Sequence, residues 1–223
     1  MEKTVLITGA SRGIGFALAQ QFLKNDFKVI ATSRTGKIEN LIHKNFEVLE
    51  LDLSNEKTIN NLAQILQNKN IKIDILINNA GIGPDLYTLE PEKESFKQTL
   101  DVNVSGTVFL TELLSSRIND GGKIINISSK MGSINICVLT DSVAYRMSKT
   151  ALNMYTKILA NRLSGKQLIA AIHPGWVRTT IAKGNVNGRL LPDESASKIF
   201  DFVVSDFETG TFWDIETQSK IEW

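Results

Sequence analysis

Short apolar runs alternate with longer stretches of helical pattern along the whole chain. The apolar runs are nearly continuous, whereas strands with one wet face alternate between apolar and polar residues. Continuous runs are typical of strands that are buried on both faces of a parallel sheet. The pattern predicts strands at Thr4–Thr8, Lys28–Thr32, Glu47–Leu51, Ile73–Asn78, Lys123–Ile127, Leu168–His173 and, weakly, Thr211–Asp214.

Helical patterns fill the intervals between these strands. Regular alternation of strand and helix predicts an α/β fold, a single-domain doubly wound parallel sheet of the Rossmann-like type with helices on both faces. No repeat or linker divides residues 1–223, so we expect one domain. Such sheets bind ligands beyond the carboxyl ends of their strands. The predicted helices are Ile14–Lys24, Glu56–Asn68, Glu92–Arg117, Ser142–Leu163 and Asp193–Val204.

Composition excludes several classes of function. A net charge of +1 gives no reason to expect nucleic acid or a membrane surface as a partner. No apolar run is long enough to span a membrane, and the N-terminus lacks a signal-peptide pattern, so we expect a cytoplasmic protein. The single Cys137 excludes an internal disulfide and is expected to be a buried small apolar residue. No cluster of metal ligands is visible, and no metal is expected.

A glycine-rich turn follows the first predicted strand. Gly9, Gly13 and Gly15 stand between Thr4–Thr8 and the first predicted helix. Free backbone N–H groups and the helix dipole at such a turn favour a pyrophosphate. The spacing is G-x-x-x-G-x-G, which differs from the G-x-G-x-x-G dinucleotide fingerprint. The alternative is a glycine-rich turn without a ligand.

Tyr145 and Lys149 stand four positions apart on a predicted helix, so they share one face. A lysine cation beside a tyrosine favours the phenolate, and we expect it to lower the tyrosine pKa. The pair then exchanges a proton with an oxygen on a reacting carbon. Alone the pair is a weak signal, and the glycine-rich turn gives it weight.

The end of the second predicted strand indicates which nicotinamide cofactor is bound. Ser33 and Arg34 stand there with no acidic residue, and Arg12 lies within the glycine-rich turn. A carboxylate at this place binds the 2′-hydroxyl of NAD, whereas an arginine accommodates the 2′-phosphate of NADP. We therefore predict NADP(H) and a reaction that runs from carbonyl to alcohol. The alternative is that both arginines are solvated surface residues.

Seven short segments, taken together, resemble the short-chain dehydrogenases/reductases. They occur in that family's order and cover essentially the whole chain. Within the family, YRMSKTALNM, HPGWVRT and the ending GTFWD…W resemble the C-factor-like branch, which includes sniffer-type carbonyl reductases. The segments are TGASRGIG (8–15), LDLS (51–54), NNAG (78–81), VNVSGT (102–107), INISS (125–129), YRMSK (145–149) and HPGWVRT (173–179).

The resemblance implies roles for individual residues. It makes Tyr145 the acid/base, Lys149 its ribose-binding partner, Ser129 a donor to the substrate oxygen, and Asn103 the support of a proton path. The implied cofactor contacts are Gly9, Ser11, Arg12, Gly13, Ile14, Gly15, Ser33, Arg34, Asp52, Leu53, Asn79, Ala80, Gly81, Tyr145, Lys149, Pro174, Gly175, Trp176, Val177 and Thr179.

Several of these residues have structural alternatives. Ser128 adjoins Ser129 at a strand end and points the opposite way. Asn103 could be a helix-packing residue, and Asp52 could cap a turn. Trp176 could be a pocket wall or part of the core. Other polar residues are expected to be structural, namely His43, His173, Asp74 and Asp141.

Two segments depart from the family pattern. Ser129 and Tyr145 are sixteen positions apart, more than the resemblance implies, so the loop Lys130–Ala144 is expected to lie over the substrate site. Its apolar residues, Ile134, Ile136, Val138 and Leu139, are candidates for the pocket wall. The second segment, Thr180–Leu191, matches a short substrate lid with Gly184 and Gly188 as possible hinges.

The predicted function is an NADPH-dependent carbonyl reductase that acts on a small-molecule aldehyde, ketone or quinone. A C-factor-like signalling protein with incidental turnover is the main alternative, and a scaffold with a relict fold is another. We also expect a homo-oligomer, a dimer or tetramer, through Glu92–Arg117 and Ser142–Leu163. Val108, Leu110 and Leu114 could form that interface or face the sheet.

Overall fold

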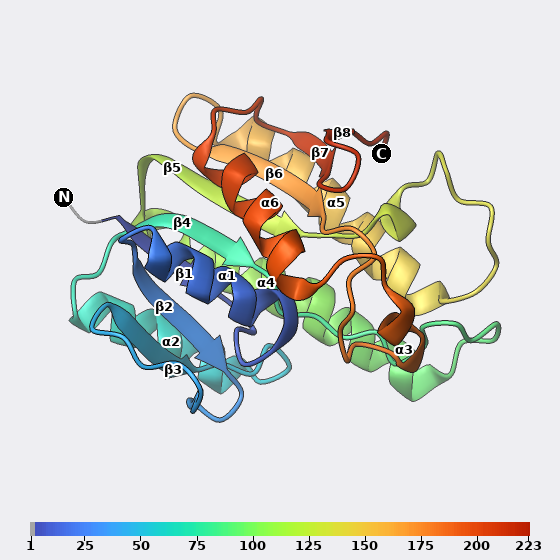
Figure 1. The fold of residues 1–223 in the computed structure, drawn as a ribbon, viewed down its shortest axis with the longest axis horizontal. Coiled ribbons are helices and arrows are strands. Elements are labelled where there is room, and N and C mark those ends of the chain that lie inside the picture. The colour runs from blue at the N-terminus through green and yellow to red at the C-terminus, as the bar shows by residue number, and fades with distance from the viewer. Residues whose placement is uncertain (1–2) are drawn as a thin grey trace.

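The computed structural model describes residues 3–223 and is built on one eight-stranded sheet (Figure 1). The strand order is β3-β2-β1-β4-β5-β6-β7-β8, and every neighbouring pair is parallel except β7 and β8. The order reverses between β1 and β4. The strands are β1 (Thr4–Ile7), β2 (Lys28–Ser33), β3 (Phe46–Glu50), β4 (Ile73–Asn78), β5 (Ile118–Ile127), β6 (Leu168–His173), β7 (Thr211–Asp214) and β8 (Ser219–Lys220).

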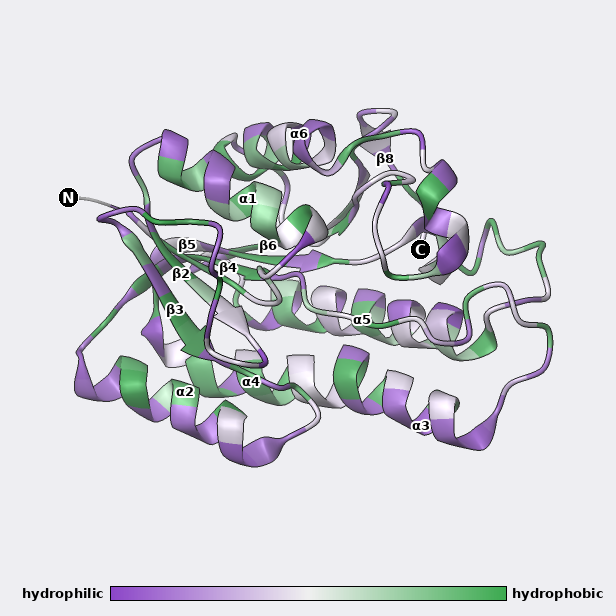
Figure 2. Ribbon diagram, turned by 60° about the horizontal axis from the view of Figure 1, so that its bottom comes forward, coloured by the Kyte–Doolittle hydropathy of each residue, from purple (hydrophilic) through white to green (hydrophobic). Residues whose placement is uncertain are grey.

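Helices cover both faces of the sheet, which confirms the predicted doubly wound α/β fold. One layer contains α1 and α6, and the opposite layer contains α2, α4 and α5 (Figure 2). The helices are α1 (Gly13–Lys24), α2 (Glu56–Asn68), α3 (Lys93–Leu100), α4 (Thr107–Leu114), α5 (Val143–Arg162) and α6 (Pro192–Val204). Short 3₁₀ segments lie at Ser115–Arg117, Lys130–Gly132 and Lys183–Asn187.

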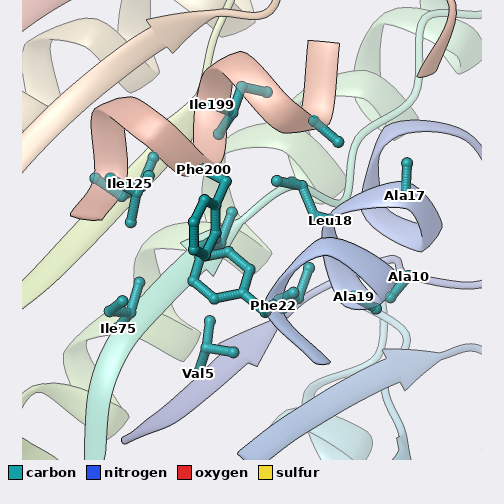
Figure 3. Packing of buried hydrophobic residues seen from close by; sticks show 14 of the residues in the cluster. Val5, Ala10, Ala17, Leu18, Ala19, Phe22, Ile75, Ile125, Ile199 and Phe200 are labelled. Carbon is teal, nitrogen blue, oxygen red and sulfur yellow. The ribbon is translucent and has the colours of Figure 1, made fainter. Parts of the chain in front are cut away.

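Alternate strand residues supply the two cores. Val5 and Ile7 of β1 pack toward α1 and α6, whereas Leu6 packs toward the other layer. Two phenylalanines join α1 and α6 to the sheet, because the rings of Phe22 and Phe200 meet edge to face with centroids 4.9 Å apart (Figure 3). Both sides of each central strand are therefore buried, as the continuous apolar runs predicted.

The structure corrects the prediction of one helix over Glu92–Arg117. A π-helical turn, Asp101–Gly106, separates α3 from α4. Gly106 lies against the Leu53 backbone so closely that an added Cβ would stand 2.1 Å from the Leu53 carbonyl oxygen. The extra residue in a π turn re-aims the side chains that follow it. Sequence periodicity does not register a one-residue insertion of this kind.

Strand boundaries were predicted less well than the strands themselves. β5 begins at Ile118, five residues before the predicted start, because the polar residues 119–122 interrupt its apolar run. The short antiparallel β8 was not predicted, since Ser219 and Lys220 are exposed and carry no apolar pattern.

Among residues 3–223, none of the helices is long and apolar enough to cross a membrane.

Substitution of Phe22 by Ala should lower the free energy of unfolding by about 3–4 kcal/mol, because it opens a cavity in a fully buried aromatic cluster. Urea unfolding monitored by circular dichroism measures the change. Ile42→Ala is the control, since that side chain is 95% exposed, and it should change stability by less than about 0.5 kcal/mol. Equal losses in the two variants would contradict the described core.

Candidate active site

Most of the predicted site residues lie beyond the carboxyl ends of β1, β4, β5 and β6, which are neighbours in the sheet. The glycine-rich turn follows β1, Asn79–Gly81 follow β4, Ser129 follows β5, and Pro174 follows β6. Tyr145 and Lys149 reach the same region from α5. The strand order therefore brings together segments that are far apart in the sequence.

The glycine-rich turn is held tightly against the end of β4. Gly9 has φ of 66°, and an added Cβ would stand 2.8 Å from the Ala80 Cα. Gly15 is equally crowded, since a Cβ there would stand 2.5 Å from the Asn79 Nδ2. Gly13 differs, because it has φ of 58° and its nearest neighbour is Thr179, 3.5 Å from the added Cβ. Gly13 thus faces the open side of the turn, toward the segment that follows β6.

Asn79 and Thr8 fasten the ends of β1 and β4 to each other. The Asn79 Nδ2 donates hydrogen bonds to the carbonyls of Thr8 (2.9 Å) and Gly9 (3.1 Å). The Thr8 hydroxyl accepts the backbone N–H groups of Asn79 and Ala80, both at 3.0 Å. Asn79 therefore positions the turn, and these hydrogen bonds account for the orientation of its side-chain amide without a cofactor contact.

The turn after β1 and the end of β2 carry exposed cations. Arg12 and Arg34 are exposed, and neither side chain forms an ion pair or a hydrogen bond within the described residues 3–223. The Ser33 hydroxyl is instead used locally, bonded to both the N–H and the carbonyl of Lys37 at 3.0 Å. Lys37, which the sequence did not mark as a site residue, lines a hollow of about 480 Å³ beside the turn. The lining residues are Ser11, Phe16, Thr35, Lys37, Ile38, Glu39 and Asn40.

Asp52 and Leu53, which follow β3, are held by local contacts. The Asp52 Oδ1 accepts the backbone N–H of Ser54 at 2.9 Å and the Ser54 hydroxyl at 2.7 Å. This is an Asx turn, the structural alternative considered for Asp52. Leu53 is buried against Gly106.

Ser129 and Tyr145 lie at the centre of the site. Ser129 is 7% exposed and its hydroxyl accepts the Met131 N–H at 3.2 Å. The adjacent Ser128 points away, because its hydroxyl donates to the Asn153 Oδ1 at 2.6 Å inside the protein. Ser129 is therefore the serine whose hydroxyl affects Tyr145.

Lys149 and Asn103 both approach the side of Gly81 on which a Cβ would stand. A Cβ on Gly81 would stand 3.3 Å from the Asn103 Oδ1 and 3.6 Å from the Lys149 Nζ. Lys149 donates to the Ile127 carbonyl at 2.8 Å, and its Nζ lies 5.6 Å from the centre of the Tyr145 ring. The structure brings the four predicted catalytic residues into one buried cluster.

Asn103 is fully bonded within that cluster. Its amide exchanges two hydrogen bonds with the backbone of Ile82, both at 2.8 Å, and also donates to the Ser148 hydroxyl at 3.0 Å. The π-helical turn sets this orientation. Ile82 and Ser148 were not among the predicted site residues, since neither carries chemistry that sequence alone would reveal.

The pKa of Tyr145 differs from the expectation. Burial raises it to about 12, interaction with the Ser129 hydroxyl opposes the rise, and Tyr87 and Asp85 add to it. The predicted lowering by Lys149 is therefore wrong for this structure. Burial also lowers the pKa of Lys149 to about 8, which weakens the cation that was expected to favour the phenolate.

The protein-family model described as short chain dehydrogenase matches residues 3–189. The chain belongs to the short-chain dehydrogenase family. It is similar to the 3-amino-tetrahydro-pyrrolizinone reductase of Xenorhabdus hominickii, with 35% identity over 201 residues, 86% of this chain and 68% of that protein. It is also similar to the 3-oxoacyl-[acyl-carrier-protein] reductase FabG of Aquifex aeolicus, with 33% identity over 188 residues, 79% of this chain and 75% of that protein.

Solved structures agree with this assignment. The carbonyl reductase Sniffer of D. melanogaster aligns with a TM-score of 0.89 and 26% identity over the full length of both chains. A short-chain dehydrogenase/reductase from Burkholderia multivorans with bound NADP gives a TM-score of 0.89 and 28% identity, again over both full chains. The predicted family and its sniffer-like branch are confirmed. The resemblance to C-factor stays a prediction.

In this short-chain dehydrogenase, the segment that follows β6 lies across the site from the glycine-rich turn, where Thr179 faces Gly13. Gly175 has φ of 81°, and Val177 pairs with Leu190 as an isolated bridge. Trp176 is 37% exposed and lies under Arg189, at 5.6 Å, so it is not a core residue. Pro174 accepts the Ser195 hydroxyl at 2.7 Å, which ties this segment to α6.

The two glycines of the predicted lid have a packing role. A Cβ on Gly184 would stand 2.7 Å from the Tyr87 ring, and one on Gly188 would stand 2.6 Å from the Arg178 backbone nitrogen. Neither has the positive φ that only glycine adopts readily. Close approach therefore explains both glycines without hinge motion.

The loop Lys130–Ala144 does not wall the catalytic cluster as expected. Its residues Ile134 and Leu139, with Met147 and Met154 of α5, line an apolar hollow of about 560 Å³. None of the four predicted catalytic residues lines this hollow. Cys137 lies here and is exposed, so the predicted burial of that thiol is wrong. The four apolar residues that were expected to wall the pocket, Ile134, Ile136, Val138 and Leu139, are instead exposed to solvent.

The remaining expectations concern structural residues. Leu110 and Leu114 are fully buried in the core beside the sheet, and Val108 packs against the same core, so they do not form an exposed interface. His173 is buried, and burial lowers its pKa to about 4. Asp74 has a structural role within β4 rather than in a loop or cap, since it accepts the Thr4 N–H of β1 at 2.7 Å. Two further residues have local roles, since His43 bonds the Asn45 N–H and Asp141 pairs with Arg146.

Replacing Lys149 by Met should raise the free energy of unfolding at pH 7 by about 2 kcal/mol, because it removes a charge that the folded state desolvates. The pKa of Lys149 is lowered from 10.5 to about 8 on folding. The cost is therefore complete below pH 8 and disappears as pH rises toward 10.5. Denaturant unfolding at pH 7 and pH 10.5 measures both values.

Lys157→Met is the control, because Lys157 is exposed on the same helix. It should change stability little at either pH. A Lys149→Met variant that is less stable than wild type at pH 7 would contradict the described burial of the amine.

Proposed function

We propose that this short-chain dehydrogenase is an NADPH-dependent reductase that converts the carbonyl of an aldehyde, ketone or quinone to an alcohol. The observation that carries the proposal is the buried cluster of Ser129, Tyr145 and Lys149 at the carboxyl edge of the sheet, with Asn103 behind it. The cluster offers a proton donor, a second hydroxyl donor and a cation within one small volume. These are the groups that carbonyl reduction requires.

The cofactor site fits NADP(H). Gly13 leaves the turn open toward Thr179, and the first turn of α1 has no side-chain cap, so its N–H groups are available to a pyrophosphate. Arg12 and Arg34 are exposed and unpaired within residues 3–223, and Lys37 adds a third cation nearby. No acidic residue directly follows β2. Two structural neighbours, from Burkholderia multivorans and from chicken fatty liver, are described with bound NADP and NADPH.

The chain's own residues handle the proton. When bound, NADPH supplies the hydride, which is chemistry that side chains do not provide. Burial raises the pKa of Tyr145 to about 12, so the phenol holds its proton at neutral pH. A protonated phenol is the form that donates to a carbonyl oxygen as negative charge develops there. Ser129 donates a second hydrogen bond to the same oxygen.

Lys149 and Asn103 complete the proposed path. The Lys149 amine donates to the Ile127 carbonyl, and Asn103 is held by Ile82 on the same side of Gly81. This arrangement places a proton-carrying amine one helical turn from Tyr145, where it can return a proton to the phenol after transfer.

Other expectations remain proposals. A signalling role with incidental turnover keeps the same cofactor site, and a cytoplasmic location and a dimer or tetramer were expected from the sequence. The named interface residues, Leu110 and Leu114, are buried, so an interface on α4 and α5 would use exposed residues instead. Those residues are Phe109, Leu113, Met154 and Ile158.

Tyr145→Phe should lower kcat for carbonyl reduction about a thousandfold, because it removes the proton donor and leaves the ring. NADPH affinity should stay within about twofold, since the hydroxyl is a small part of the cofactor site. NADPH oxidation at 340 nm and fluorescence titration measure the two quantities. Tyr155→Phe is the matched control on the same helix, because its hydroxyl bonds Glu112. Unchanged turnover in Tyr145→Phe would sink the catalytic assignment.

Arg34→Asp should lower the ratio of NADPH to NADH affinity about tenfold or more, because it replaces a charge-assisted hydrogen bond with a repelling carboxylate. Lys44→Asp makes the same change of charge at an exposed position before β3 and should leave the ratio unaltered. The dissociation constants of NADPH and NADH for wild type and both variants give these ratios. If both variants lose NADPH equally, the preference reflects overall charge rather than Arg34.

A further inference from the structure

The helix that carries Tyr145 begins without a cap of its own. Ser142 occupies the N-cap position with a left-handed φ of 57°, and its side chain makes no hydrogen bond to the helix. The first turn contains no acidic residue. A 20-residue helix nevertheless presents free N–H groups and partial positive charge at this end. These groups need partners from elsewhere in the chain.

Asp85 supplies the missing acceptor from a segment 60 positions earlier. Its side chain is almost wholly buried, at 2% exposure, and its Oδ2 accepts the backbone N–H of Tyr145 at 3.2 Å. Tyr145 is the third residue of α5, and the N–H at that position is one that an N-cap side chain ordinarily binds. The Asp85 carboxylate therefore replaces the N-cap oxygen of the helix.

Ser142 and the turn Asp85–Thr88 bind each other in return. The Ser142 hydroxyl accepts the Tyr87 N–H at 2.9 Å, and the Ser142 N–H donates to the Thr88 carbonyl at 2.8 Å. Tyr87 also has a left-handed φ, of 70°. Such conformations persist in residues other than glycine only when the surroundings fix them. Here each left-handed residue is fixed by the other segment.

The same segment also contacts the Tyr145 ring. A Cβ on Gly83 would stand 3.0 Å from the Tyr145 Cδ2, so this part of the chain lies directly against the ring. Farther along, the Tyr87 hydroxyl donates to the Asn185 Oδ1 at 3.1 Å and so reaches the predicted lid. Both the backbone and the ring of the proposed proton donor are thus set by residues 83–87.

The charge of Asp85 is not neutralised by a partner side chain. Its Oδ1 is buried and has no hydrogen-bond partner among residues 3–223. The titratable and polar groups that face Tyr145 are Ser129, Lys149, Tyr87 and Asp85. After burial, which is the largest cause, the Asp85 charge is among the effects that raise the pKa of Tyr145.

We propose that Asp85 is a positioning residue for Tyr145: it fixes the first turn of the catalytic helix through the Tyr145 N–H, and its negative charge faces the tyrosine from outside the helix. The proposal rests on the proposed function only where it concerns proton donation. The structural part, an external cap on α5, stands on the hydrogen bonds alone. The two parts are therefore tested by separate measurements.

Three variants separate the hydrogen bond from the charge. Asp85→Asn keeps an oxygen acceptor and removes the charge, whereas Asp85→Ala removes both. Glu90→Gln removes a negative charge from an exposed position in the same segment and is the control. The conservative Asn variant keeps the test valid should the Ala variant unfold.

Hydrogen exchange of residues 142–149, followed by mass spectrometry, tests the cap without any turnover. Asp85→Ala should speed exchange of the Tyr145 amide about tenfold, the change expected from one lost hydrogen bond. Asp85→Asn and Glu90→Gln should resemble wild type. Should the Ala variant unfold, retained protection in Asp85→Asn supports the cap, and its loss overturns it. Unchanged protection in a folded Asp85→Ala would also overturn the cap.

Alkaline titration of Tyr145 tests the charge. The ultraviolet absorbance of the phenolate, with the Tyr145→Phe variant as the baseline, reports loss of the phenol proton, and removing the facing carboxylate stabilises the phenolate. Asp85→Asn should therefore move this titration to lower pH by about half a unit. Glu90→Gln should not move it, and a titration curve for Asp85→Asn identical to wild type overturns the electrostatic part.

The wild-type turnover measurement separates failure of this inference from failure of the proposed function. Turnover in wild type with unaltered exchange and Tyr145 titration in the Asp85 variants would overturn the role of Asp85 alone. Absence of turnover in wild type would overturn the reductase proposal and, with it, the proton-donor part of this inference. Faster exchange in Asp85→Ala would still support the cap in that case.

Discussion

The burial of Tyr145 and Lys149 at the end of the sheet is the constraint on which the site depends. Both side chains are less than one-tenth exposed, so neither is well solvated in its charged form. Burial therefore raises the pKa of the tyrosine and lowers that of the lysine, and the two groups move toward their neutral states. A neutral phenol suits a proton donor, and an amine with a pKa of about 8 suits a group that exchanges protons near neutral pH.

Close backbone contacts hold together the segments that surround these two side chains. Glycines bring the turn after β1 against the end of β4, and Gly106 brings the π-helical turn against Leu53. The π-helical turn in turn aims Asn103 at Ile82 and at Gly81, beside Lys149. An added Cβ at Gly9, Gly15 or Gly106 would stand less than 3.0 Å from a neighbouring atom, so the contacts leave no room for a methyl group. Close backbone packing therefore lies beside the buried ionisable side chains of the site.

Much of the fold and the site could be predicted from the sequence. Continuous apolar runs located the seven parallel strands, and the glycine-rich turn and the Tyr145–Lys149 spacing located the site. What could not be predicted were effects of three-dimensional packing. The direction of the Tyr145 pKa depends on burial, which a spacing of four residues does not report. The π-helical turn depends on the approach of Leu53, and the contact of Asp85 with α5 joins residues 60 positions apart.

Residues without a recognisable chemical signature were missed for the same reason. Ile82 contributes only its backbone to Asn103, and Lys37 gains its meaning from the hollow beside Ser11. Cys137 shows the reverse error, because a typical preference for burial was overridden by its place in an exposed loop. The sequence thus identifies the residues that carry chemistry, and the structure identifies those that set their environment.

Transfer of deuterium from 4-deuterated NADPH to a panel of aldehydes and ketones tests the central claim most directly. Mass spectrometry of the products reports whether the label reaches the carbonyl carbon. The account predicts an alcohol that carries one deuterium on that carbon when the matching face of the cofactor is labelled. Tight NADPH binding with no label in any product, from either face, would contradict it and would favour the signalling role.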